Sequence, residues 1–177
     1  MPPSVIKSIR DLIYYQYAKI LAESAGYGKG NYEFSMEKWN ELKSGKVDFK
    51  SSVTSLIKDM DDPKRCTFCG QLVPLKQCKL LPKGPDILSN KVQACFNCVL
   101  NKGDEPVYQW FGLDNRDTIP KLAELKYLKL LYKLHEKQGT LDEENVVKLH
   151  KKAGTEHIQI EDEPLNVICL ERTILKQ

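Results

Sequence analysis

Apolar residues recur at helical spacing in the first third of the chain. They predict a helix over 4–25 with Ser4 as its N-cap. Shorter patterns of the same kind predict a helix over 35–42 and a third helix, which Asp48 caps and which ends near residue 60. Residues 1–62 are therefore expected to form an N-terminal helical region.

The pattern changes at about residue 63. Apolar runs become short, Pro or Gly interrupts them, and five of the six cysteines of the chain appear here. Such a segment has too few regular apolar positions to build a core of its own, and a bound metal is the usual substitute. We therefore predict a compact metal-binding module over 63–112.

Helical periodicity returns after the cysteine-rich segment. It predicts a helix over 105–111 with Asp104 as its cap. A long helix over 117–138 follows, with Asp117 as its cap and Gly139 just beyond its end. This long helix has the strongest apolar pattern in the chain.

The last part of the chain carries weaker patterns. A helix is predicted over 141–152, and a weak alternation of apolar residues predicts a β-hairpin over 157–175. Residues 113–177 are expected to pack on the metal module. The predicted fold class is α+β, a mainly helical protein around a small metal-stabilised module.

Length and composition narrow the class of protein. The chain has 177 residues, of which 41% are hydrophobic and 29% charged, as in a globular protein of one domain or two small ones. No run of about 18 apolar residues is present, so we expect no membrane span. The N-terminus lacks the apolar core of a secretion signal, which favours a cytoplasmic protein. In that compartment cysteines bind metals more often than they form disulfides.

Four cysteines form two C-x-x-C pairs that are separated by 25 residues: Cys66 with Cys69, and Cys95 with Cys98. Two residues between cysteines allow a tight turn to aim both thiolates at one ion about 2.3 Å away, and two such turns complete a tetrahedral zinc site. A site with four protein ligands leaves no open position, so the Zn²⁺ is expected to be structural. The alternatives are four buried thiols or a thioredoxin-type redox pair, which would need only one C-x-x-C.

The two other cysteines are expected to be structural thiols. Cys78 lies between the pairs and is predicted to be buried, with a role as substitute metal ligand as the alternative. Cys169 belongs to an apolar run and is predicted to lie in the core.

Further motifs lie in a fixed order around the cysteine pairs. Leu80-Leu81-Pro82 follows the first pair, Asn90 precedes the second, and Lys102-Gly103 follows the second. In this order, over 39 of the 177 residues, they resemble the zinc-knuckle type of the HNH (ββα-metal) endonuclease superfamily. The resemblance implies a β-hairpin and a helix around the metal site.

The catalytic positions of that superfamily are replaced in this chain. Lys79 stands at the position of the histidine that activates water, Cys78 at that of an aspartate metal ligand, and Val99 at that of an asparagine. A lysine ammonium at its ordinary pKa of about 10.4 stays protonated at neutral pH and cannot act as a base. Asn90 remains, and the resemblance gives it a role in orienting the loop. We expect nuclease activity to have been lost.

Basic residues are concentrated in the module. Residues 63–103 hold seven of them against one acid, Asp86, a net charge of +6, whereas the whole chain has +3. These seven are the predicted contacts to nucleic-acid phosphates: Lys64, Arg65, Lys76, Lys79, Lys83, Lys91 and Lys102. The alternative is that they only keep a small module soluble. A second basic stripe follows one face of the long helix: Lys126, Lys129, Lys133 and Lys137.

Three hypotheses of function follow. The leading one is a zinc-containing, HNH-like protein that binds DNA or RNA without cutting it, as a component of a nucleoprotein or ribonucleoprotein complex. The second is an active metal-dependent endonuclease with a displaced site at Asp86 or Asp104. The third is a protein–protein adaptor that uses the apolar cluster 108–111 and the acidic turn 161–163.

Overall fold

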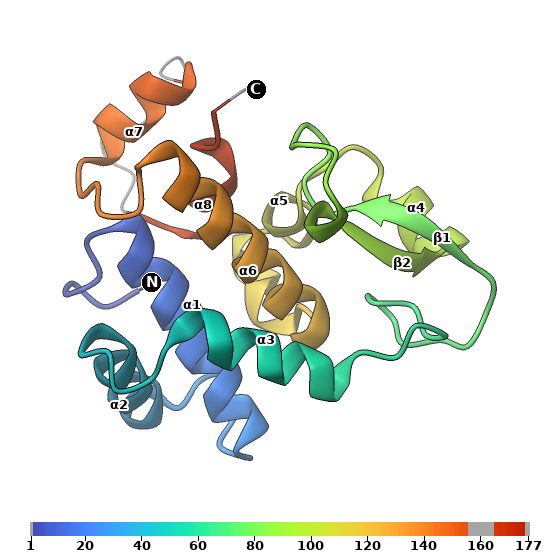
Figure 1. Ribbon diagram of the computed structural model, residues 1–177, viewed down its shortest axis with the longest axis horizontal. Coiled ribbons are helices and arrows are strands. Elements are labelled where there is room, and N and C mark those ends of the chain that lie inside the picture. Colours follow the sequence, from blue (N-terminus) through green and yellow to red (C-terminus); the bar gives the residue numbers. More distant parts are fainter. Residues whose placement is uncertain (1, 156–164, 176–177) are drawn as a thin grey trace.

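The computed structural model describes residues 2–155 and 165–175, and it is mainly helical with one small antiparallel sheet (Figure 1). This confirms the predicted α+β class. In chain order the elements are α1 (Ile9–Ser24), α2 (Tyr32–Lys43), α3 (Phe49–Met60), β1 (Leu75–Lys79), the 3-10 turn η1 (Leu88–Asn90), β2 (Lys91–Cys95), α4 (Phe96–Lys102), α5 (Val107–Phe111), the 3-10 turn η2 (Leu113–Thr118), α6 (Lys121–Gln138), α7 (Val146–Ala153) and α8 (Val167–Arg172).

The helices pack around α6, which runs through the centre of the molecule (Figure 1). Its Leu125, Leu128 and Leu131 are fully buried, and α1 and α3 lie against it. An aromatic cluster joins these three helices, because the Phe49 ring lies 5.3 Å from the Tyr17 ring and 4.8 Å from the Tyr132 ring. Burial of each large apolar side chain contributes about 1.5–3 kcal/mol.

The module with β1, β2 and α4 lies at the end of the molecule opposite α2 and α7 (Figure 1). Its core is continuous with that of the helices, because Leu80 and Val92 belong to the same cluster of buried residues as the α6 leucines. Phe68 packs edge-on against Trp110 of α5, with ring centres 5.1 Å apart. The module is thus anchored to the helices by apolar contacts.

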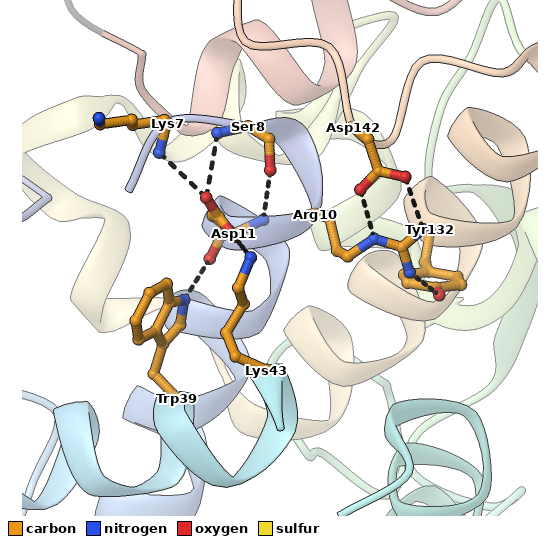
Figure 2. Close-up of polar contacts among 8 residues, drawn as sticks. All are labelled: Lys7, Ser8, Arg10, Asp11, Trp39, Lys43, Tyr132 and Asp142. Atoms are coloured by element: carbon orange, nitrogen blue, oxygen red, sulfur yellow. Dashed lines mark hydrogen bonds and ion pairs between the residues drawn. The ribbon is translucent and has the colours of Figure 1, made fainter. Parts of the chain in front are cut away.

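The first helix begins at Ser8 and not at Ser4, so the predicted N-cap is wrong. The Ser8 hydroxyl accepts the Asp11 backbone N–H (3.1 Å), and the Asp11 carboxylate accepts the Ser8 N–H (3.3 Å), which is a reciprocal capping box. Figure 2 shows that Asp11 also joins two helices, because Lys43 of α2 donates to its carboxylate (2.5 Å) and Trp39 donates to its carbonyl (3.1 Å).

The helices after the module also begin differently from the prediction. Asp104 does not cap α5; the buried Glu171 of α8 accepts the N–H groups of Tyr108 (3.0 Å) and Gln109 (2.8 Å) instead. Asp117 lies in η2, and Pro120 takes the N-cap position of α6. At α5 a contact distant in sequence thus replaces a local cap, whereas no side chain caps α6.

Two other helices begin at different residues than predicted, and one predicted element is absent from the described residues. Asp48 caps α3 as predicted, whereas α2 starts at its cap Asn31 and α7 starts at its cap Asn145. The predicted β-hairpin over 157–175 is wrong where the structure describes it, because residues 167–172 form helix α8. Its first half, up to residue 164, lies outside the described residues.

We predict that Asp11→Ala lowers the free energy of unfolding by about 1–2 kcal/mol, because it removes the acceptor for the capping N–H groups and for Lys43. Chemical denaturation measures this change. Asp142→Ala is the control, since Asp142 makes an exposed bidentate pair with Arg10 (2.7 and 3.0 Å) worth less than about 1 kcal/mol (Figure 2). An equal or smaller loss for Asp11→Ala would contradict the capping account.

His135 predicts a pH dependence of stability. Its imidazole is fully buried in α6, where Nε2 donates to the Leu170 carbonyl (2.8 Å) and Nδ1 accepts from the Thr140 hydroxyl (2.7 Å). Burial lowers the pKa of His135 to about 4. In the unfolded chain the histidine pKa is about 6.5, so between pH 6.5 and pH 4 the unfolded chain binds a proton at this residue and the folded protein does not. The free energy of unfolding therefore decreases as the pH falls from 6.5 to 4.

We therefore predict that the wild type loses about 2–3 kcal/mol more stability than His135→Gln between pH 7 and pH 4.5. Urea unfolding at the two pH values measures the difference, and other titrating groups affect both proteins alike. Parallel pH profiles, or an imidazole of His135 that titrates near pH 6.5 in NMR spectra, would contradict a His135 that is buried and neutral in the folded protein.

Candidate metal centre

The four cysteines of the two C-x-x-C pairs converge on one point. The sulfur atoms of Cys66, Cys69, Cys95 and Cys98 all lie within 4.8 Å of one another, and those of Cys69 and Cys95 are 3.7 Å apart. Sulfurs at the corners of a tetrahedron with metal–sulfur bonds of about 2.3 Å are about 3.8 Å apart. The cluster therefore has the size and the donor set of a site for one metal ion.

The first pair lies on a tight turn. Gly70 closes it with a backbone φ of +73°, which only glycine adopts without strain, and its N–H donates to the Cys66 carbonyl (2.9 Å). The Cys66 N–H donates to the Gln71 carbonyl (3.0 Å), and the Thr67 N–H donates to the Gln93 carbonyl of β2 (2.9 Å). These bonds hold the first pair against the strand that leads to the second.

The second pair lies where β2 ends and α4 begins. Cys95 is both the last residue of the strand and the N-cap of the helix, and its sulfur accepts the Cys98 N–H (3.4 Å). Strand β2 pairs with β1 in antiparallel register, with Leu75 opposite Cys95. The sheet and the first turn of α4 therefore fix the direction of both thiols.

Backbone N–H groups favour the thiolate form of one of the four cysteines. Burial acts to raise the pKa of Cys66, but N–H groups of Cys69, Cys95 and Phe68 point at its sulfur and together lower the pKa to about 7. Burial and the neighbouring thiols raise the pKa of Cys98. Without a cation the four sulfurs cannot all carry charge at this distance, so a bound metal is needed for four thiolates.

The two other cysteines are not part of the cluster. Cys78 is half-buried in β1, and its sulfur lies 3.6 Å from the Lys79 carbonyl. Cys169 is buried in α8 among core residues, as predicted. The set that the structure brings together is thus the set that the spacing predicts.

The loop between the strands is held by Asn90. This side chain is fully buried, accepts the Leu81 N–H (2.8 Å) and donates to the carbonyls of Leu81 (2.9 Å) and Pro85 (3.0 Å). Gly84 lies so close that an added Cβ would be 2.9 Å from a Leu81 methyl carbon and 3.1 Å from the Asn90 amide nitrogen. Asn90 therefore orients this loop, which matches its expected role.

No general base lies where the resemblance would put one. Lys79 and Lys91 face each other across the end of the sheet, and Asp86 pairs with both, at 3.9 Å and 2.7 Å. Lys91, by its hydrogen bond and its charge, and then Lys79 lower the pKa of the Asp86 carboxylate. Of the histidines, His135 and His150 are buried in α6 and α7, outside the module, and His157 lies outside the described residues.

The predicted basic contacts differ in how they are placed. Lys64, Arg65, Lys76 and Lys83 are exposed at the surface, and Arg65 pairs with Asp62 at 3.3 Å. Lys79 and Lys91 are partly exposed and share Asp86. The module therefore offers six basic side chains to solvent.

Lys102 is the exception, because its side chain is only 1% exposed. Burial lowers its pKa, opposed by the charges of Cys78 and Glu171, and its Nζ has no hydrogen-bond partner among residues 2–155 and 165–175. A buried ammonium cannot reach a phosphate, so Lys102 does not fit its predicted role. Nothing in the sequence separates this lysine from its exposed neighbours.

The adaptor hypothesis depends on the apolar cluster 108–111 and the acidic turn 161–163. Most of the apolar cluster packs inside the protein. Tyr108 is fully buried, and Trp110 packs on Phe68 as described. The acidic turn at 161–163 lies outside the described residues. Sequence reasoning also missed an exposed aromatic side chain, Phe96, which is 57% exposed beside the second cysteine pair.

Comparisons of the chain with protein-family models, with curated proteins and with solved structures found no match. Within the described part of the chain, no helix combines the length and apolar character needed to cross a membrane. The function is therefore inferred from the module itself.

We predict that removing the metal unfolds the module locally. The apparent binding free energy of a structural zinc is about 10–16 kcal/mol in small modules, and β1, β2 and α4 are too short to persist without it. After chelation, hydrogen exchange should become fast in these elements, while α1 and α6 keep their protection. Unchanged protection at 75–102 would contradict a metal-dependent module.

Serine substitutions identify the ligands. Each of Cys66→Ser, Cys69→Ser, Cys95→Ser and Cys98→Ser should lower the metal content of the purified protein and its melting temperature. Cys78→Ser is the matched control, since it removes a thiol of the same module outside the cluster. Metal content measured by mass spectrometry checks this, and loss of metal in the control would add Cys78 to the ligand set.

Proposed function

We propose that the protein is a zinc-containing, HNH-like nucleic-acid-binding protein that holds DNA or RNA without cutting it, as a component of a nucleoprotein complex. The observation that carries this proposal is that the cysteine cluster and a set of basic side chains lie on the same small hairpin. A four-cysteine cluster lies at the base of a β-hairpin whose charged side chains, apart from Asp86, are all basic: Lys76, Lys79, Lys83 and Lys91.

Zinc is the ion that fits the cluster best. Four thiolates in a tetrahedral arrangement favour zinc over magnesium or calcium, which prefer oxygen ligands. When bound, Zn²⁺ supplies a cross-link between the two cysteine pairs. It has no open position for water or substrate, so its role is structural.

The charge of the module favours binding to phosphates. Four thiolates and Zn²⁺ together carry about −2, which leaves the +6 of residues 63–103 at about +4. The ion pairs at Asp86 and Asp62 reduce the local field further. In the described part of the chain no carboxylate lies within ion-pairing distance of the ammonium groups of Lys64, Lys76 and Lys83, so these are free for phosphates.

The residues at the former catalytic positions explain why cleavage is not expected. The Lys79 ammonium is a hydrogen-bond donor and offers no lone pair to activate water. Cys78 is half-buried, and burial raises its pKa, so it is a poor substitute for a carboxylate ligand. Lys79 can instead contact a phosphate at the site where the superfamily hydrolyses one.

We predict that the protein binds a mixed set of DNA and RNA oligonucleotides at low salt, with an affinity that falls steeply as salt rises. The triple variant Lys64→Glu, Lys76→Glu, Lys83→Glu should bind at least about tenfold more weakly, because three phosphate contacts become repulsive. Fluorescence anisotropy over a salt series measures both.

The control variant carries the same change of net charge on exposed lysines outside the module: Lys7→Glu, Lys46→Glu, Lys151→Glu. Equal losses in the two variants would mean that binding follows net charge alone. No binding of the wild type to any nucleic acid would refute the proposed function.

Cleavage assays separate the proposal from the displaced-nuclease alternative. The protein should leave plasmid DNA and structured RNA intact with Mg²⁺ or Mn²⁺. Cleavage that disappears in Asp86→Ala or Asp104→Ala would favour an enzyme instead. Partners that stay bound after nuclease treatment of a lysate would favour the adaptor.

A further inference from the structure

The second cysteine pair presents an aromatic ring to solvent. Phe96 follows Cys95 directly and opens α4, and its side chain is 57% exposed. A phenylalanine normally lies in a core, and burying one contributes about 1.5–3 kcal/mol, so an exposed ring forgoes that stabilisation. Leu100, one turn later on the same face of α4, is 66% exposed.

A cation accompanies the exposed ring. The ammonium group of Lys76, on the neighbouring strand β1, lies 5.0 Å from the centre of the Phe96 ring. This is cation–π distance, and it leaves more than half of the side chain uncovered. No acid of the described residues pairs with Lys76, so its charge is available to an anion next to the ring.

The module around the ring is basic, with a net charge of +6 over residues 63–103. Of its lysines, Lys76 lies beside the ring, whereas Lys79 and Lys91 pair with each other on the opposite face of the sheet. An apolar protein partner would have to desolvate the Lys76 ammonium, whereas a nucleic acid can pair a phosphate with it and stack a base on the ring. The charge of this end of the molecule thus favours one occupant.

We propose that Phe96 and Lys76 form a stacking site for an unpaired nucleobase, so that the module prefers single-stranded nucleic acid. This deepens the proposed function and rests on it. The base stacks on the open face of the Phe96 ring, the Leu100 side chain extends the apolar platform, and the Lys76 ammonium contacts the adjoining phosphate. In a duplex the bases are already stacked on one another, so the ring has no free base to receive.

The test compares single strands with duplexes. Labelled oligo(dT) and oligo(U) of about 20 nucleotides, and the duplexes dA·dT and A·U of the same length, are titrated with the zinc-loaded full chain. Phe96→Ala should weaken binding to the single strands by about 5- to 100-fold, the range for loss of one stacked base, and leave duplex binding within about twofold. Phe96→Trp should keep or strengthen single-strand binding.

Two further variants separate stacking from other effects. Phe96→Leu keeps an apolar side chain without a ring and should lose affinity as Phe96→Ala does. Tyr32→Ala removes an equally exposed aromatic side chain (57%) from the opposite end of the molecule and should change nothing. Zinc content and melting temperature, measured on every variant, show that the module is intact.

The outcomes are distinct. A wild type that binds no nucleic acid refutes the proposed function and this inference together. A wild type whose binding to single strands and duplexes is unaffected by Phe96→Ala leaves the proposed function standing and overturns the stacking site. A dimer that sediments as a monomer only in Phe96→Ala would assign the α4 face to a second copy of the chain and would also overturn it.

Discussion

The convergence of four sulfur atoms on one point is the constraint on which the module depends. Two strands of five residues and a helix of seven cannot hold a fold alone, because a two-stranded hairpin is marginal in water and so short a helix is unstable without packing. The cluster ties the first cysteine turn to the junction of β2 and α4. Lys76 of β1 lies beside that junction, where its ammonium group contacts the Phe96 ring.

Contacts around the cysteine cluster connect the module to the helices of the rest of the molecule. Asn90 fixes the loop between the strands, and Phe68, next to the first cysteines, packs against Trp110 of α5. Glu171 of α8 then caps α5 from more than sixty residues away, with the Tyr127 hydroxyl of α6 also donating to it. The cysteine module is thus one end of a continuous core.

Sequence patterns predicted those features that local chemistry determines. The C-x-x-C spacing identified the cysteine cluster because a tight turn fixes the direction of two thiols, and Asp48 was identified as a cap because its own side chain makes the bond. Ser4 and Ser8 are both possible caps by residue type, and the reciprocal hydrogen bonds with Asp11 are what make Ser8 the N-cap of α1. The weak alternation after residue 165 was too short to distinguish a strand from a buried helix turn.

Other features depend on contacts that no local pattern records. Glutamate usually lies at the surface, yet Glu171 is buried at the start of α5, where burial raises its pKa to about 7. Lys102 reads as one more basic residue, yet the packing of α4 buries it. Phenylalanine usually lies in a core, yet within the described part of the chain more than half of Phe96 is exposed. Burial of charge and exposure of aromatics are both decided by tertiary packing.

The central claim is that four thiolates hold one zinc ion at the base of the basic hairpin. X-ray absorption at the zinc edge of the purified protein tests it most directly, since it reports the identity, number and distance of the ligands. The account predicts a single shell of four sulfurs at about 2.3 Å. A shell that contains nitrogen or oxygen, or a protein purified without zinc, would contradict it.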